Sequence, residues 1–205
     1  MPPRGRPESL TRDEIVAATL RLLLREGLSR LTMRAVAAEL GVTPMATYYY
    51  VRGKDDLIKL AYEEISSSMA PLRLEPGGWE APLRRYLTSL WVELARYPGL
   101  GGYMIEQPSL GVTPAAVAEG IRFFEEAGFA PSKAPLAWSF AVTYILGRII
   151  VDARLGHQHE APRFEGLRAQ SYLEFGIEAV ICGLRELRDF DADVTVDGDG
   201  ATSSW

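Results

Sequence analysis

The stretch TMRAVAAELGVTPMATYYYV, residues 32–51, decides the fold of the N-terminal part of this 205-residue chain. Apolar side chains recur in its first half at the spacing of one helix face, at Met33, Val36, Ala37 and Leu40. Gly41 then permits the positive φ of a tight turn, and Thr43 with Pro44 supplies an N-cap and a first-turn proline for a second helix. Two helices joined by a short glycine-containing turn predict a helix-turn-helix.

Three consecutive tyrosines end this stretch, and helix geometry predicts where they point. Thr47 and Val51 lie four residues apart and should face the preceding helices, with Tyr48 at the edge of that face. The outward positions are then Met45, Ala46, Tyr49 and Tyr50. An exposed tyrosine can bond a phosphate oxygen or a base edge, and its ring can pack on a thymine methyl group. These four side chains are candidate base contacts in the major groove; the alternative is a protein interface, where exposed tyrosines are also common.

The rest of the chain follows a helical pattern. Apolar spacing predicts further helices over residues 11–26, 54–65, 83–94, 114–124, 132–155 and 165–187. No strand-like alternation stands out, so we expect an all-α protein of about nine helices. We expect an N-terminal domain over residues 1–62 and a larger helical domain over residues 63–190, with a break near residues 71–78. The acidic tail, residues 191–205, is expected to be disordered.

Charge divides the chain at the same place. Residues 1–62 contain 10 Lys and Arg against 7 Asp and Glu, whereas the remainder contains 12 against 20. A basic segment on an acidic body can bind a polyanion locally, so a nucleic-acid partner would meet the N-terminal end.

Cysteine content and hydropathy bear on the compartment. Cys182 is the only cysteine, which excludes an intrachain disulfide, and we expect it to be a small core residue of the last helix. The start of the sequence lacks the apolar run of a secretion signal, and the stretch WSFAVTYILG before Arg148 is too short to span a bilayer. A cytoplasmic protein without a membrane partner is therefore expected.

These residues resemble the TetR family of transcriptional regulators. The similarity is clearest over residues 11–62, in the run LTMRAVAAELGVTPMATYYYVRGKDDLI, and extends more loosely into EEAGFAPSKA and YLEFGIEAVICGL, which are similar to the branch that includes the tetracycline repressor. The resemblance implies phosphate or base contacts from Arg34, Thr43, Tyr48 and Lys54. Thr47 departs from the family, which usually has a large aliphatic residue there.

The resemblance also implies a homodimer. One recognition helix makes few base contacts, and a twofold pair can read two half-sites of double-stranded DNA. The last two long helices are the candidate dimer surface, because their small residues allow close helix approach: Gly147, Gly176, Ala179 and Gly183. The alternative is that these residues relieve crowding inside one subunit.

Aromatic side chains in the larger domain predict a ligand pocket. The candidates are Trp91, Tyr103, Met104, Phe123, Phe124, Trp138 and Tyr144. Each one alone is better explained as core, but as a group they can line a site for a mostly apolar small molecule. By resemblance, such a ligand would shift the dimer to a conformation that no longer fits its operator.

Other features carry weaker signals. The run HQHE, residues 157–160, lacks a third or fourth metal ligand at a recognised spacing, so we expect neither a metal nor another cofactor. Arg4 and Arg6 are consistent either with minor-groove contacts or with a disordered arm. No nucleophile elbow, phosphate loop or dinucleotide fingerprint is present, which disfavours an enzyme. A ligand-released repressor is therefore predicted, with a constitutive dimeric DNA-binding protein as the alternative.

Overall fold

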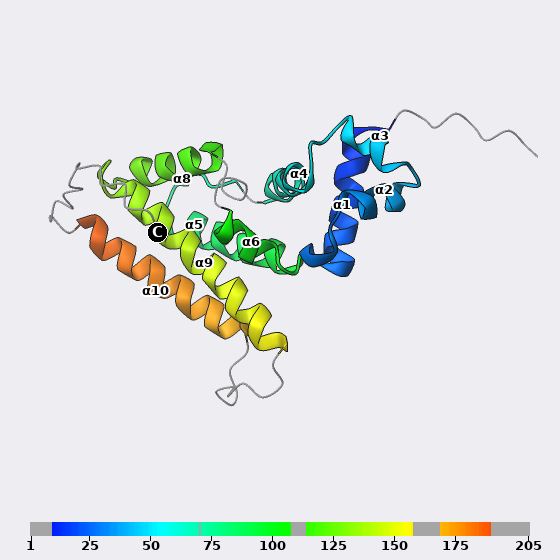
Figure 1. Cartoon of the computed structure of the whole chain (residues 1–205). Helices are drawn as coiled ribbons and strands as arrows, with labels where there is room; N and C mark the ends of the chain where they lie inside the picture. Colours follow the sequence, from blue (N-terminus) through cyan, green and yellow to red (C-terminus); the bar gives the residue numbers. More distant parts are fainter. Residues whose placement is uncertain (1–9, 70, 108–113, 158–168, 190–205) are drawn as a thin grey trace, which may run out of the picture.

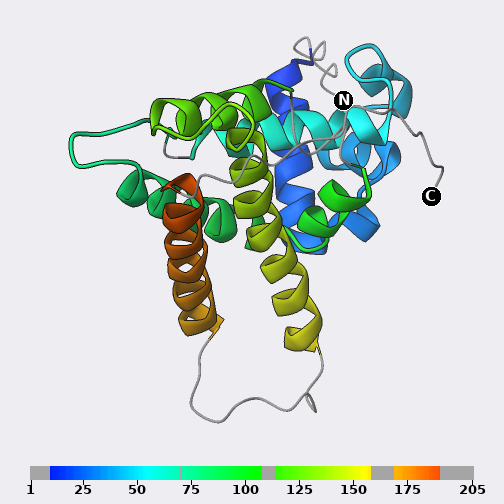
Figure 2. The ribbon, with the colours of Figure 1, turned by 90° about the vertical axis from the view of Figure 1, so that its left-hand side faces the viewer.

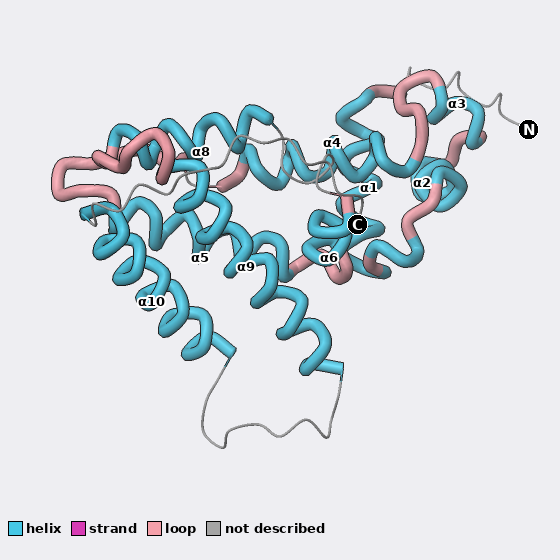
Figure 3. Tube along the Cα trace, turned by 60° about the vertical axis from the view of Figure 1, so that its left-hand side comes forward, coloured by secondary structure: helices cyan, strands magenta, loops and turns pink. Residues whose placement is uncertain are grey.

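The computed structural model describes residues 10–69, 71–107, 114–157 and 169–189. Within these ranges it contains nine α-helices, one 3-10 turn and no strand, which confirms the all-α prediction (Figure 3). The N-terminal unit consists of α1 (Arg12–Glu26), the 3-10 turn η1 (Leu28–Arg30), α2 (Met33–Leu40), α3 (Pro44–Tyr48) and α4 (Lys54–Ser67). The body consists of α5 (Glu80–Ala95), α6 (Leu100–Glu106), α8 (Pro114–Glu126), α9 (Ala134–His157) and α10 (Ala169–Asp189).

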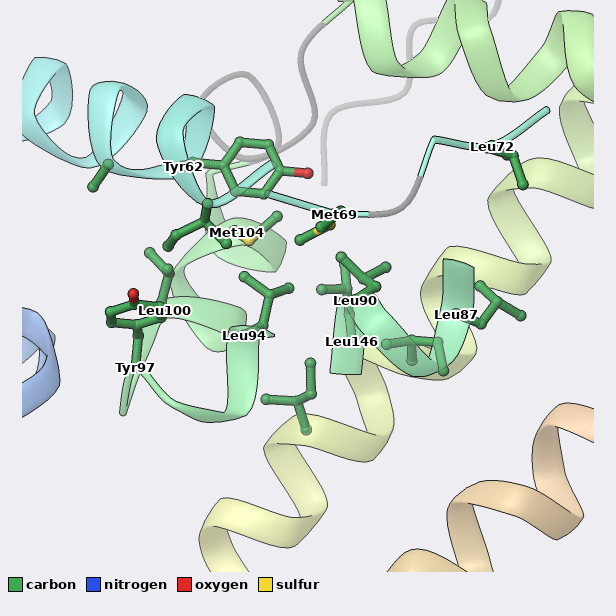
Figure 4. Packing of buried hydrophobic residues seen from close by; sticks show 14 of the residues in the cluster. Tyr62, Met69, Leu72, Leu87, Leu90, Leu94, Tyr97, Leu100, Met104 and Leu146 are labelled. Atoms are coloured by element: carbon green, nitrogen blue, oxygen red, sulfur yellow. The ribbon is translucent and has the colours of Figure 1, made fainter. Parts of the chain in front are cut away.

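The two parts lie at opposite ends of the molecule. Figure 1 shows α1, α2 and α3 at one end and α8, α9 and α10 at the other, with α4 and α6 between them. The long helices α9 and α10 run side by side (Figure 2). One hydrophobic cluster extends from Ile15 in α1 to Leu184 in α10, and Figure 4 shows side chains of α4, α5, α6 and α9 meeting in it. The N-terminal unit is therefore packed onto the body rather than tethered to it.

Local sequence signals explain the first helices. Thr11 and Glu14 form a capping box at the start of α1, and the Thr32 side chain caps α2. Gly41 ends α2 in the left-handed conformation with φ 68°, and a side chain there would meet no atom within 4 Å. The turn of the helix-turn-helix thus needs glycine for its backbone angle and not for space.

One helix was not expected from the sequence. No helix was predicted between residues 94 and 114, yet α6 begins at Leu100. Its Gly101 packs against α9, where an added Cβ would lie 2.9 Å from Ile149 Cγ2. Gly101 and Gly102 have low helix propensity, so this short helix depends on tertiary packing.

The prediction that the apolar stretch before Arg148 is too short to span a bilayer requires a correction. Among the described residues, Ala134–Arg154 is long and apolar enough to cross a membrane by length and composition, whereas the sequence was expected to be too short there. In the structure 44% of the apolar window is buried inside the protein, and α9 packs against α5, α8 and α10. A helix that packs against several neighbours needs an apolar composition in a globular protein as well.

Two ion pairs fasten α10 to α5. Arg84 Nη2 donates to Glu178 Oε2 at 2.9 Å, and Arg185 Nε donates to Glu80 Oε1 at 2.6 Å. The hydrogen bonds from these guanidinium groups hold the pKa of Glu178 and of Glu80 below its usual range. The folded protein therefore favours both carboxylates in their ionised form.

We expect this α5–α10 contact to weaken in acid. Because the folded-state pKa of Glu178 is lowered, its stabilisation is present above the unfolded pKa and is lost as pH falls through the folded value. Glu178→Gln should lower the free energy of unfolding by about 0.5 kcal/mol at neutral pH, since exposed pairs contribute little, and should have no effect at about pH 2. Urea titrations at both pH values check this. The control is Glu174→Gln, whose wild-type carboxylate accepts a bond from neutral Gln170; an equal effect of both substitutions would contradict the prediction.

Candidate functional site

The helix α3 is anchored on one side by residues that the sequence predicted to face inward. Thr47 is fully buried and Val51 is 2% exposed, which confirms that prediction. The Thr47 hydroxyl donates to the Pro44 carbonyl at 2.7 Å. The polar atom that this departure from the family buries is therefore satisfied, and its burial does not disturb the packing of α3.

The other side of α3 and the two residues that follow the helix are exposed to solvent. Tyr49 is 83% exposed, Met45 67%, Tyr48 50% and Tyr50 43%, while Ala46 is half-buried. None of the three tyrosines is buried. The helix ends at Tyr48, and Tyr49 and Tyr50 follow it as a turn. Large apolar side chains in one exposed row are unusual on a monomer surface and indicate a binding partner.

Polar candidates border this row. Arg34 on α2 and Thr43 at the start of α3 are both exposed, and the Thr43 side chain makes no capping hydrogen bond. Figure 1 places α3 at the end of the molecule away from α8 and α10, so a long ligand such as duplex DNA can approach it without meeting the body.

Lys54 is bonded within the protein. Its Nζ donates to the Leu28 carbonyl at 3.1 Å, while Asp55 accepts a hydrogen bond from the Tyr103 hydroxyl at 2.5 Å. This bond to Asp55 raises the pKa of Tyr103 to about 12. The first residues of α4 thus connect η1 and α6. An ammonium group has three donors, so the bond to Leu28 leaves Lys54 with donors for a phosphate.

Lys54→Met is expected to weaken binding to specific and random duplexes alike. Loss of one phosphate contact should flatten the slope of log affinity against log salt by about one unit. Fluorescence anisotropy over a salt series measures this slope. Lys59→Met removes an exposed lysine of the same helix and serves as the control. An unchanged slope for Lys54→Met, or an equal change in both variants, would exclude a specific role for Lys54.

The body contains a cavity of about 230 Å³. It lies where the end of α4 and the segment after it meet α5, α8 and α9. It is lined by Tyr62, Ser66, Ser67, Met69, Pro71, Leu72, Tyr86, Ala116, Glu119, Gly120 and Trp138. Tyr62, Met69 and Leu72 are seen from close by in Figure 4. A Cβ at Gly120 would lie 2.2 Å from the Trp138 ring, so this glycine makes room for the indole.

The sequence candidates for ligand contact do not gather around this cavity. Of the seven, only Trp138 is among its lining residues. Phe123 and Phe124 lie in the core, in aromatic contact with one another, and Met104 is buried there too. Tyr103 lines a second cavity of about 280 Å³ beside η1, α6 and α9.

Two of the candidates hold helices together. Trp91 Nε1 donates to Asp152 Oδ2 at 3.1 Å, and the Tyr144 hydroxyl donates to the Tyr172 carbonyl at 3.0 Å. Conversely, Tyr62, Ser66 and Glu119 were not predicted to line a site, because the cavity forms only where the end of α4 meets α8.

Exposed apolar side chains follow α9 and α10. Leu136, Phe140 and Val151 share one side of α9, and Phe175 on α10 is 78% exposed. Cys182 lies two turns after Phe175 on the same side and is exposed, so its expected place in the core was wrong. The apolar stripe that includes it points away from the subunit's own core.

The small residues of α9 and α10 were predicted either to allow a dimer contact or to relieve crowding inside one subunit, and they divide between these two interpretations. Gly176 packs inside the subunit, because an added Cβ would lie 1.7 Å from the Tyr144 hydroxyl oxygen. Gly147 and Gly183 would meet no atom within 4 Å, and Ala179 is exposed. Crowding inside one subunit thus explains Gly176 alone, and the other three remain available for a helix from a second chain.

Metal ligation finds no support in the part of the chain that the structure describes. No cluster of three His, Cys, Asp or Glu side chains occurs in this part. His157 ends α9, and the rest of the HQHE run lies outside the described residues, as do Arg4, Arg6 and the acidic tail.

A helix-turn-helix with a solvent-exposed second helix, joined to a helical body with a cavity, defines a class of all-α regulatory proteins. Residues 15–61 match the family described as bacterial regulatory proteins, tetR family, and residues 70–176 match the tetracyclin repressor-like C-terminal domain. The chain belongs to the TetR family.

Individual relatives agree with this assignment. The HTH-type transcriptional repressor DrrR1 of Streptomyces coeruleorubidus is 38% identical over 111 residues, which are 54% of this chain and 41% of that protein. The chain thus spans less than half the length of this curated relative. A TetR variant from Acinetobacter baumannii AYE in complex with minocycline has a TM-score of 0.74 at 22% identity, covering 88% of this chain and 99% of its own. ActR of Streptomyces coelicolor in complex with actinorhodin has a TM-score of 0.72 at 20% identity, covering 89% and 100%. These two structures share the fold.

Proposed function

We propose that this protein is a DNA-binding transcriptional regulator, a homodimeric repressor that leaves a palindromic operator when a small molecule enters its body. The observation that carries the proposal is the exposed row of Met45 and the three tyrosines on a helix whose inner side is fixed by Thr47 and Val51. Family membership and a relative named as a repressor support it. A cytoplasmic location follows from this role.

The proposed contacts divide by chemistry. Base edges in the major groove would be touched by Met45, Ala46, Tyr49 and Tyr50, and the backbone or bases by Arg34, Thr43, Tyr48 and Lys54. All of them belong to a DNA-binding domain over residues 1–62. The phosphate contacts supply affinity and register, whereas the base contacts supply sequence discrimination.

A twofold dimer would form through the exposed stripes of α9 and α10. Two helices from each chain would make a four-helix bundle, with Phe140 and Phe175 in its interface. The domain over residues 63–190 would thus serve both dimerisation and ligand binding, and the two DNA-binding domains would stand at a fixed spacing.

The ligand would act through α4. The end of this helix lines the 230 Å³ cavity through Tyr62 and Ser66, and its start is bonded to η1 and α6 through Lys54 and Asp55. A ligand that favours another position of the α4 end would therefore also shift the DNA-binding domain. The shift in equilibrium cannot exceed the ligand's differential affinity for the two states.

Binding to the DNA upstream of its own gene tests the function. We expect preference for this DNA over random duplex and a steep loss of affinity as salt rises, because phosphate contacts release counterions. A protein without affinity for any duplex would contradict the proposal and would leave the enzyme alternative. Binding that no small molecule reverses would favour the alternative of a constitutive dimeric DNA-binding protein.

A further inference from the structure

The 230 Å³ cavity combines aromatic faces with negative charge. The rings of Tyr86 and Trp138 line it with centroids 5.7 Å apart and a tilt of 43°. Among the described lining residues, Glu119, an exposed residue of α8, is the charged one, and no Lys, Arg or His contributes. In the described parts of the chain, the Glu119 carboxylate has no ion-pair partner. The wall therefore offers a negative charge beside electron-rich rings.

Hydroxyl groups complete the polar part of this wall. Burial raises the pKa of Tyr86, and the nearby Tyr62 and Glu119 raise it further, so the phenol stays neutral at physiological pH. The Tyr86 hydroxyl forms no hydrogen bond with any described residue. Ser66 interacts with Tyr62, but its buried oxygen makes no hydrogen bond of good geometry within the described structure. The Tyr86 oxygen beside the cavity thus remains available to a donor on a ligand, whereas the Ser66 oxygen is covered by the protein.

We infer that the ligand of this site is a planar aromatic cation, a small fused-ring system with a protonated amine. The rings would lie against Trp138 and Tyr86, and the positive charge would face Glu119 and the tyrosine oxygens. A neutral or anionic ring system would cover the Glu119 carboxylate without compensating its lost hydration. The inference rests on the proposed function and refines its mostly apolar ligand to an amphipathic one.

The size of the cavity limits the ligand. Small-molecule sites commonly have about 300–1,000 Å³, so a cavity of about 230 Å³ suits a few fused rings without large substituents. Gly120 keeps this wall in place, because any side chain there would displace the Trp138 ring that lines the cavity.

Two acridines test the charge preference. 9-Aminoacridine is a cation at neutral pH and acridine-9-carboxylate is an anion, while both share one ring system. Calorimetric titration of the full chain without DNA should show at least about tenfold tighter binding of the cation, equivalent to about 1.4 kcal/mol. Glu119→Gln should remove this preference, because it should lower the affinity for the cation about tenfold. Glu125→Gln, an exposed position of α8 outside the cavity lining, should leave both affinities unchanged.

Failure of this inference can be distinguished from failure of the proposed function. Equal affinity for the two acridines, absence of binding, or equal effects of Glu119→Gln and Glu125→Gln would overturn the inference. DNA release is measured separately, as the difference between wild type and Glu119→Gln at one concentration of 9-aminoacridine, because intercalation into DNA acts equally on both. Cation binding that depends on Glu119 but releases no DNA supports the ligand class and counts against ligand-controlled repression.

Discussion

Phe175→Glu is expected to convert the protein into a monomer and to reduce operator affinity by about 100-fold or more, the effect of losing an interface hot spot. Phe175 is 78% exposed on α10, where a phenyl ring gains nothing from water. In a four-helix bundle it would be covered by the partner, and a glutamate there would place an unpaired charge in the interface. The monomer would keep one recognition helix and hence only one half-site.

Sedimentation velocity and DNA binding measure the two consequences of this substitution. Leu187→Glu is the matched control, because Leu187 is also exposed on α10 but points to a different side of the helix. The control should stay dimeric and bind its operator. A dimeric Phe175→Glu variant, or a monomeric Leu187→Glu variant, would show that the dimer forms through another surface.

Tyr49→Ala and Tyr50→Ala are each expected to reduce the discrimination between operator and random duplex by about tenfold, and the double variant by about 100-fold, since a good base contact contributes about 1–3 kcal/mol. Neither side chain belongs to the core, so the helix content and the thermal midpoint should stay near wild type. Their loss should leave the salt dependence of random-DNA binding unchanged, because base contacts do not release counterions.

Competition binding against random duplex at fixed salt measures this discrimination. Leu24→Ala removes an apolar side chain that is 51% exposed on α1 and serves as the control. If both tyrosine variants keep wild-type specificity, the tyrosines do not read bases, and an interface with another protein becomes the better interpretation of the exposed row.

Much of the N-terminal unit could be predicted because its signals are local. The Thr11 cap, the Gly41 turn and the inward pair Thr47 and Val51 each depend on residues within one or two helical turns. Helix periodicity also found α9, which starts two residues later than expected, and α10.

Features that depend on distant residues were not predictable in the same way. The cavity requires the end of α4 to meet α8 and α9, so the sequence could not indicate that Ser66 and Glu119 face a common space. Cys182 was expected in the core because cysteine is usually buried, but its position two turns after Phe175 puts it on the outer stripe. The bond from Lys54 to the Leu28 carbonyl likewise joins residues far apart in sequence.

Dimethyl sulfate protection of the bound operator tests most directly whether α3 of each subunit enters the major groove. The reagent methylates guanine N7 in the major groove and adenine N3 in the minor groove, so it separates the two grooves. We predict two symmetric sets of protected N7 atoms, about one helical turn or a multiple of it apart, both weakened in the Tyr49→Ala, Tyr50→Ala double variant. A single protected set, or N7 protection that the double variant leaves intact, would contradict recognition by the tyrosine-bearing helix of a twofold dimer.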